Sequence, residues 1–126
     1  MRILLSFEKK YRVYMDAMAA AIREFRPEVE VALVDAEELE TQVERFDPQL
    51  LICSPPIPEI AVDDGLAWIE LSPEPEQASR FRVGDRHWES TNPTLGEILP
   101  VVEETKRLLR VAREQEDPTA AEEEQV

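Results

Sequence analysis

Cysteine, histidine and basic residues are scarce in this sequence. Its one cysteine, Cys53, excludes an internal disulfide and a cysteine-cluster metal site. The single histidine, His87, leaves any acid–base chemistry to itself or to a carboxylate. Lysine and arginine number 14 against 28 acidic residues, so the formal net charge is −14. This charge argues against sequence-independent binding to DNA or RNA, whose phosphates need cationic partners, and against docking on an anionic membrane.

Long apolar runs are also missing. Because no stretch of about 18 apolar residues occurs, the sequence predicts no membrane-spanning helix. The first ten residues, MRILLSFEKK, hold too short an apolar stretch for a signal peptide and no small-residue cleavage site. We therefore expect a cytoplasmic location. Hydrophobic residues still make up 43% of the 126 residues, which suffices for the core of one domain.

The C-terminal segment, residues 114–126, differs from the rest of the chain. Its sequence, EQEDPTAAEEEQV, holds six acidic residues and no basic one. Because it also lacks aromatic residues and apolar periodicity, we expect an acidic, disordered tail after a domain at residues 1–113. Its simplest role is to keep the protein in solution.

Apolar periodicity predicts alternating strands and helices in the first half of the chain. Residues 2–7 and 50–53 are apolar runs typical of buried strands, and residues 28–36 alternate as another strand. One helical face is formed by Tyr11, Met15, Met18, Ile22 and Phe25, and a second, shorter one by Leu39, Val43 and Phe46. Arg26-Pro27 ends the first helix, Asp47-Pro48 ends the second, and Asp35 with Glu38 predicts a capping box at the second helix.

The second half is less regular. Residues 55–65 contain three prolines and predict a loop, and residues 66–71 predict a fourth strand. Residues 80–90 form either one strand with an extended exit or a hairpin turning at Gly84-Asp85. A long terminal helix follows a second capping box of Thr94 and Glu97. Pro100 either kinks this helix or opens its regular part.

Strands and helices in this order imply right-handed crossovers and a parallel sheet. The order, the third-strand segment Pro48-Gln49-Leu50-Leu51 and the Asn92-Pro93 pair before a helix together resemble the receiver domain of bacterial response regulators. The resemblance implies a flavodoxin-like α/β fold with a mostly parallel sheet of about five strands and three helices. The helices that a receiver carries after its third and fourth strands are expected to be missing or replaced by loops.

The resemblance also assigns positions at the ends of the strands. Ser6 and Phe7, followed by Glu8, stand where a receiver has the acidic residues that hold Mg²⁺. Ser54 stands in place of the phosphorylated aspartate. Ser72 matches the hydroxyl residue after the fourth strand, and Asn92 stands in place of the lysine.

These replacements remove the receiver's chemistry. Phosphoryl transfer to an aspartate needs a carboxylate acceptor, and Mg²⁺ needs oxygen ligands that Phe7 cannot provide. The resemblance therefore implies a phosphorylation-incompetent fold with no catalytic residue, metal or cofactor. Open α/β sheets bind ligands at the carboxyl ends of their strands. The set Ser6, Phe7, Glu8, Ser54, Ser72 and Asn92 is thus a candidate ligand pocket.

A second candidate site is the one basic, aromatic-bearing patch of this acidic chain. It comprises Arg80, Arg82, Arg86 and Trp88, together with Trp68 on the fourth strand. Because two receiver helices are expected to be absent, we expect both tryptophans on the thinly covered face of the sheet, as interface anchors. The main hypothesis is a non-enzymatic regulatory or protein-interaction module, binding another protein or a second copy. The alternative is a sensor of a small ligand or anion.

Overall fold

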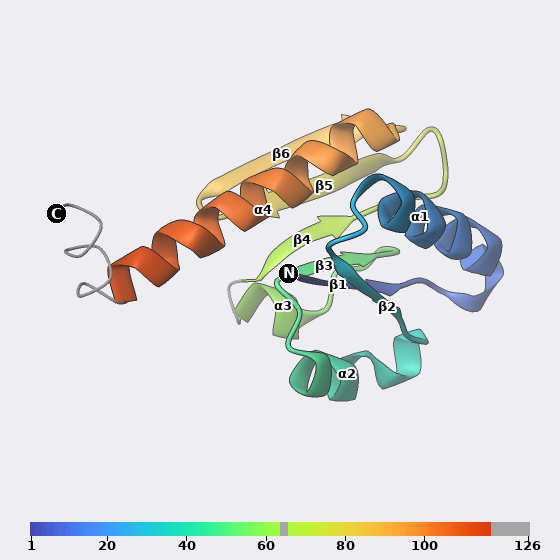
Figure 1. The fold of residues 1–126 in the computed structure, drawn as a ribbon. Coiled ribbons are helices and arrows are strands. Elements are labelled where there is room, and N and C mark those ends of the chain that lie inside the picture. Colours follow the sequence, from blue (N-terminus) through green and yellow to red (C-terminus); the bar gives the residue numbers. More distant parts are fainter. Residues whose placement is uncertain (64–65, 117–126) are drawn as a thin grey trace, which may run out of the picture.

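The computed structural model describes residues 1–63 and 66–116 (Figure 1). The elements are β1 (Arg2–Ser6), α1 (Arg12–Phe25), β2 (Glu30–Leu33), α2 (Leu39–Phe46), β3 (Leu50–Cys53), α3 (Glu59–Asp63), β4 (Ala67–Glu70), β5 (Ala78–Val83), β6 (Arg86–Thr91) and α4 (Leu95–Glu116). Short 3₁₀ turns, η1 (Lys9–Tyr11) and η2 (Ala36–Glu38), precede α1 and α2. The strands form one mixed sheet in the order β2-β1-β3-β4-β5-β6, so the chain is an α/β protein.

Strands β2, β1, β3 and β4 run parallel, as the alternation of elements predicts. Helices α1 and α4 pack on one face of the sheet, and α2 and α3 pack on the other. β1 and β3 lie between these two layers, and both are almost wholly buried. Burial on both faces explains why these strands are continuous apolar runs without alternation.

The last two strands correct the expected fold. β5 runs antiparallel to β4, and β6 runs antiparallel to β5, so the sheet has six strands and an antiparallel part. Only residues 71–77 separate β4 from β5, which is too short for the crossover that a parallel neighbour needs. The hairpin alternative for residues 80–90 is confirmed. Its turn has Gly84 at a φ of 60°, as in a type II′ turn.

The helices differ from expectation in number. A short helix, α3, lies within the predicted loop 55–65 and follows Pro58, so the described residues form four helices rather than three. Ala61 on α3 is fully buried and packs with Trp68 on the face of the sheet that α2 also covers. Between β4 and β5 the described chain forms no helix, as expected. Residues 64–65 lie outside the described ranges.

The ends of the helices follow partly from the sequence. Asp47 adopts a left-handed conformation with a φ of 49° and closes α2, where the sequence predicts a stop. The capping box of Asp35 and Glu38 is wrong, because the Asp35 side chain makes no capping hydrogen bond. Pro100 lies inside α4, and α4 continues to Glu116, beyond the domain boundary expected at residue 113. The rest of the expected tail, residues 117–126, lies outside the described residues.

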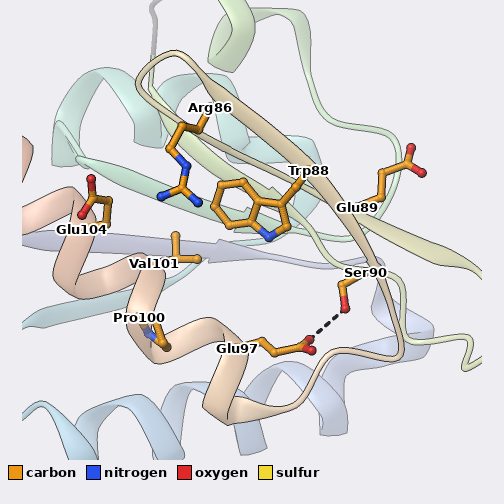
Figure 2. Close-up of a pocket in the computed structure, with 8 residues that line it drawn as sticks. All are labelled: Arg86, Trp88, Glu89, Ser90, Glu97, Pro100, Val101 and Glu104. Carbon is orange, nitrogen blue, oxygen red and sulfur yellow. Dashed lines mark hydrogen bonds between the residues drawn. The ribbon is translucent and has the colours of Figure 1, made fainter.

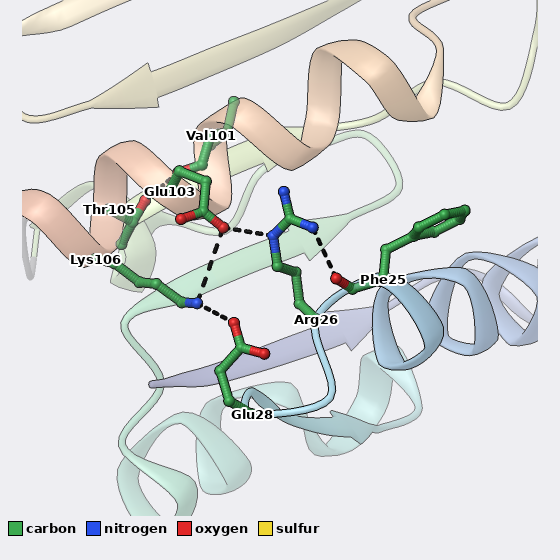
Figure 3. A network of polar contacts seen from close by, with 7 residues as sticks. All are labelled: Phe25, Arg26, Glu28, Val101, Glu103, Thr105 and Lys106. Carbon is green, nitrogen blue, oxygen red and sulfur yellow. Dashed lines mark hydrogen bonds and ion pairs between the residues drawn. The ribbon is translucent and has the colours of Figure 1, made fainter.

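A polar network ties α4 to the parallel strands (Figure 3). The guanidinium of Arg26, just after α1, donates to Glu103 on α4. Lys106 on α4 donates to Glu28 and lies 3.8 Å from Glu103. These pairs fix the helix that covers β5 and β6 to the segment between α1 and β2. None of the helices in the described ranges is long and apolar enough to cross a membrane.

Candidate functional site

The carboxyl ends of β1 and β3 meet, as expected for parallel neighbours. Ser54 donates its backbone N–H to the carbonyl of Ser6 at 3.1 Å, and its Oγ accepts the N–H of Glu8 at 3.0 Å. Ser72 is held in a separate group, because its Oγ donates to Gln77 Oε1 at 2.8 Å and its N–H donates to Ser79 Oγ at 2.9 Å. The strand-end hydroxyls of Ser54 and Ser72 therefore bond to the protein itself.

Most of the residues at the carboxyl ends of the parallel strands are buried. Ser6, Ser54 and Ser72 are all buried, and the Ser6 Oγ has no hydrogen-bond partner. Phe7 is also buried, and its ring centroid lies 5.7 Å from that of Tyr14 on α1. Phe7 thus belongs to the core between α1 and the sheet. In this arrangement Glu8 is the exposed member of the group.

Asn92 does not join the strand-end group, which corrects its assignment. It follows β6, which β4 and β5 separate from β3 in the sheet, and it is exposed with a φ of 51°. In a receiver-like sheet the last strand would lie beside β4. Here the antiparallel β5 takes that place, so the Asn92-Pro93 motif begins two strands away.

The reactive groups near the strand ends are few. Burial raises the pKa of the Cys53 thiol to about 12, with a smaller contribution from the charge of Glu70. A thiol with this pKa stays protonated and is a poor nucleophile at neutral pH. Within residues 1–63 and 66–116, no three His, Cys, Asp or Glu side chains come close enough together to hold a metal ion.

The second candidate site divides between the two faces of the sheet. Trp68, Arg80 and Arg82 lie on the side of α2 and α3, because Trp68 pairs with Arg82 across β4 and β5. Arg86 and Trp88 lie on the opposite side, where Trp88 packs with the core beneath α4. The expectation that both tryptophans share the thinly covered face is therefore wrong for Trp88.

We call one surface of the antiparallel strands the hairpin face. It comprises Trp68, Glu70, Ala78, Arg80, Arg82, His87, Glu89 and Thr91, which the cross-strand pairings place on one side. No helix of the described chain packs over the part formed by β5 and β6, whose side chains on this face are exposed or half-buried. Residues 71–77, between β4 and β5, form no helix that could cover this surface.

An ion pair lies at the inner border of the hairpin face. Arg80 donates to both carboxylate oxygens of Glu70, at 2.8 and 2.9 Å, and Glu70 also accepts the N–H of Ile57 at 2.6 Å. The hydrogen bond from Arg80 lowers the pKa of the nearly buried Glu70 carboxyl. This bidentate geometry fixes both side chains, and it joins the hairpin to the loop after β3.

Trp68 is buried beneath the polar side chains of the hairpin face, so it is not an exposed interface anchor. Only 4% of Trp68 is exposed, because it packs with Leu51 and Ala61 and is covered by polar side chains. The Arg80 guanidinium lies 5.7 Å from the centroid of the Trp68 ring. The His87 ring packs edge-on against the same ring, with the two ring centroids 6.3 Å apart. The exposed part of the surface is therefore mainly polar.

On the opposite face, β6 and α4 enclose a hollow of about 410 Å³ (Figure 2). The Trp88 ring stacks on the Phe81 ring, with their centroids 5.1 Å apart. The Arg86 guanidinium covers Trp88 and lies 5.2 Å from the centroid of its ring. Ser90 donates to Glu97 on α4 at 2.9 Å. Arg86 and Glu97 thus line the same hollow, beside the free edge of the sheet.

No family model, curated protein or solved structure matches this chain. Sequence reasoning did not include Glu70, His87 and Glu89 among the candidate site residues. The hairpin alternative could have identified His87 and Glu89, because a turn at Gly84-Asp85 pairs Arg82 with His87 and Arg80 with Glu89.

Proposed function

We propose that this protein is a non-enzymatic protein-interaction module that makes its contacts through the β5–β6 hairpin. The observation that carries the proposal is the open hairpin face, which no helix within residues 1–63 and 66–116 covers. It presents Arg80, Arg82, His87 and Glu89 over a buried tryptophan. Arginine is enriched in protein interfaces relative to the rest of the protein surface. The regulatory role expected of a phosphorylation-incompetent, receiver-like module is part of the same proposal.

Rigid support favours this use of the hairpin. The bidentate pair of Arg80 and Glu70 holds one side of the hairpin, and the stack of Phe81 and Trp88 holds the other. A partner that binds there meets side chains that are already ordered, which lowers the entropic cost of binding. The alternative, a ligand sensor at the strand ends, has less support because Ser54 and Ser72 are buried and bonded internally.

A photo-crosslinking amino acid at Ala78 tests the proposal. Ala78 is an exposed alanine at the start of β5 on the hairpin face, and Ala20 is an exposed alanine on α1. We expect irradiation in the native cell to give a discrete protein adduct from position 78 and none from position 20. Mass spectrometry would identify the partner, and purified components should reproduce the binding. Equal adducts at both positions, or none at position 78, would contradict the proposal.

A further inference from the structure

The free edge of β6 is the starting point for a more specific inference, which rests on the proposed function and concerns its partner. β6 is the last strand of the sheet, and all six of its residues pair with β5 without a bulge. It contains no proline, which would remove a backbone donor from the edge. An unblocked edge can accept another strand.

The opposite edge of the sheet differs. β2 has four residues, and the Arg23 side chain on α1 donates to the carbonyl of Val31 at 2.8 Å. A carbonyl that already accepts this bond is less able to pair with another strand. Within residues 1–63 and 66–116, no side chain forms a hydrogen bond with a backbone group of β6. The protein therefore protects one edge and leaves the other free.

The hairpin register identifies the backbone groups that point outward. Val83 and Arg86 close the two-residue turn, and such a closing pair exchanges both backbone hydrogen bonds. Arg86, Trp88 and Ser90 therefore bond to β5. The N–H and C=O groups of His87 and Glu89, and of Thr91 after them, point away from the sheet.

A second β6 strand can meet these groups in an antiparallel, two-fold arrangement. Placing Trp88 opposite Trp88 of the second copy puts His87 opposite Glu89 of that copy, and the outward backbone groups of each pair face each other. The imidazole of His87 can donate to the Glu89 carboxylate, and this contact occurs twice. Moving the register by two residues puts Glu89 opposite Glu89, which is unfavourable because like charges repel.

The α4 side of the same arrangement is also complementary. Arg86 lies opposite Ser90 of the second copy, and each Ser90 donates to Glu97 of its own α4. The Arg86 guanidinium therefore comes next to a carboxylate beside the hollow that β6 and α4 enclose. The two half-buried Trp88 rings meet at the centre, where an aromatic cross-strand pair is stabilising.

We infer that a second copy of this chain binds at the β6 edge and that the two sheets join into one continuous sheet. The pairing is antiparallel and isologous, with His87 against Glu89 on one face and Arg86 near Glu97 on the other. Because the contact is one strand wide, the dimer is expected to be weak and concentration-dependent.

Sedimentation of the full chain from micromolar to millimolar concentration tests this inference. We expect a monomer–dimer equilibrium. His87→Glu places like charges at both symmetric contacts and should raise the dissociation constant about tenfold. Adding Glu89→His restores opposite partners in this register and should recover dimerisation. Thr41→Glu, an equal change of charge on exposed α2, should leave dimerisation unchanged.

A second variant tests the backbone pairing. Glu89→Pro removes an N–H that points away from β5, so the hairpin should fold while the dimer is lost. A monomer at all concentrations, or a dimer that H87E does not weaken, overturns the inference. If dimerisation fails while position 78 still crosslinks another protein, only the choice of partner is wrong. If both fail, the proposed function is wrong as well.

Discussion

The parallel and antiparallel parts of the sheet differ in how they are covered. β1 and β3 lie between helices on both faces, and they are apolar along their whole length. β5 and β6 have α4 on one face only, and their exposure alternates along each strand. One sheet thus contains a sealed part that supplies the core and an open part that supplies the surface.

The comparison separates stability from interaction. Residues in the parallel part are expected to contribute mainly to folding, because each strand is packed on two sides. Residues on the open side of β5 and β6 contribute little to burial and are free to contact another protein. Substitutions in the parallel part should therefore lower the stability of the fold. Substitutions on the open side of β5 and β6 should mainly weaken binding to another protein.

The largest expected effect is in the parallel part. Leu51 on β3 is fully buried, so Leu51→Ala should lower the free energy of unfolding by about 2–5 kcal/mol, through lost apolar burial and a cavity. Arg82→Ala, on the neighbouring open face, should change it by no more than about 0.5 kcal/mol. Urea unfolding of both variants at low concentration measures the difference. Similar losses would break the comparison.

An intermediate effect is expected where the two parts join. Glu70→Gln weakens the bonds to Arg80 and Ile57 and should cost about 1–2 kcal/mol near neutral pH. Arg80 lowers the pKa of the folded Glu70 carboxyl below its ordinary value of 4.5. Its stabilisation is therefore present above pH 4.5 and lost as pH falls through the folded pKa.

The pH dependence sharpens this prediction. The free energy that separates wild type from Glu70→Gln should shrink as the solution is acidified, in urea titrations across this range. Glu76→Gln, the same change in the exposed loop before β5, is the matched control. A constant difference at every pH would mean that the charge of Glu70 is not what stabilises the junction.

The smallest effect on stability is expected at the surface ion pair between α4 and the segment that follows α1. Lys106→Met removes the pair with Glu28, whose pKa the lysine lowers, but this pair lies at the surface. Ion pairs at the surface contribute little to stability, so the thermal midpoint should fall only slightly, and less so at high salt. Lys9→Met, in an exposed turn, is the control. A loss as large as that of Leu51→Ala would show that α4 depends on this network.

The sequence predicts the sealed part better than the open part, for physical reasons. β1 and β3 are recognisable because strands covered on both faces leave uninterrupted apolar runs. The short α3 was missed because Pro55, Pro56 and Pro58 indicate a loop, although Pro58 directly precedes the helix. The sequence does not predict the direction of β5, because alternation alone does not distinguish parallel from antiparallel neighbours.

The positions of several candidate site residues also could not be predicted from the sequence, because they depend on strand order and register. Asn92 was misplaced because a motif can match in order while an inserted antiparallel strand moves it across the sheet. Trp88 was assigned to the wrong face because its side depends on the hairpin register. The Glu70–Arg80 pair joins two strands, so its detection also needs that register.

Hydrogen exchange at single amides, measured at low and high protein concentration, tests whether β6 is the strand that contacts another protein. We expect the amides of His87 and Glu89 to gain protection as the protein concentration rises. Those of Arg86, Trp88 and Ser90 should be protected throughout, and those of β2 should not change. Equal exchange of the outward β6 amides at both concentrations, or an equal gain at β2, would contradict the claim that the open hairpin is the contact element.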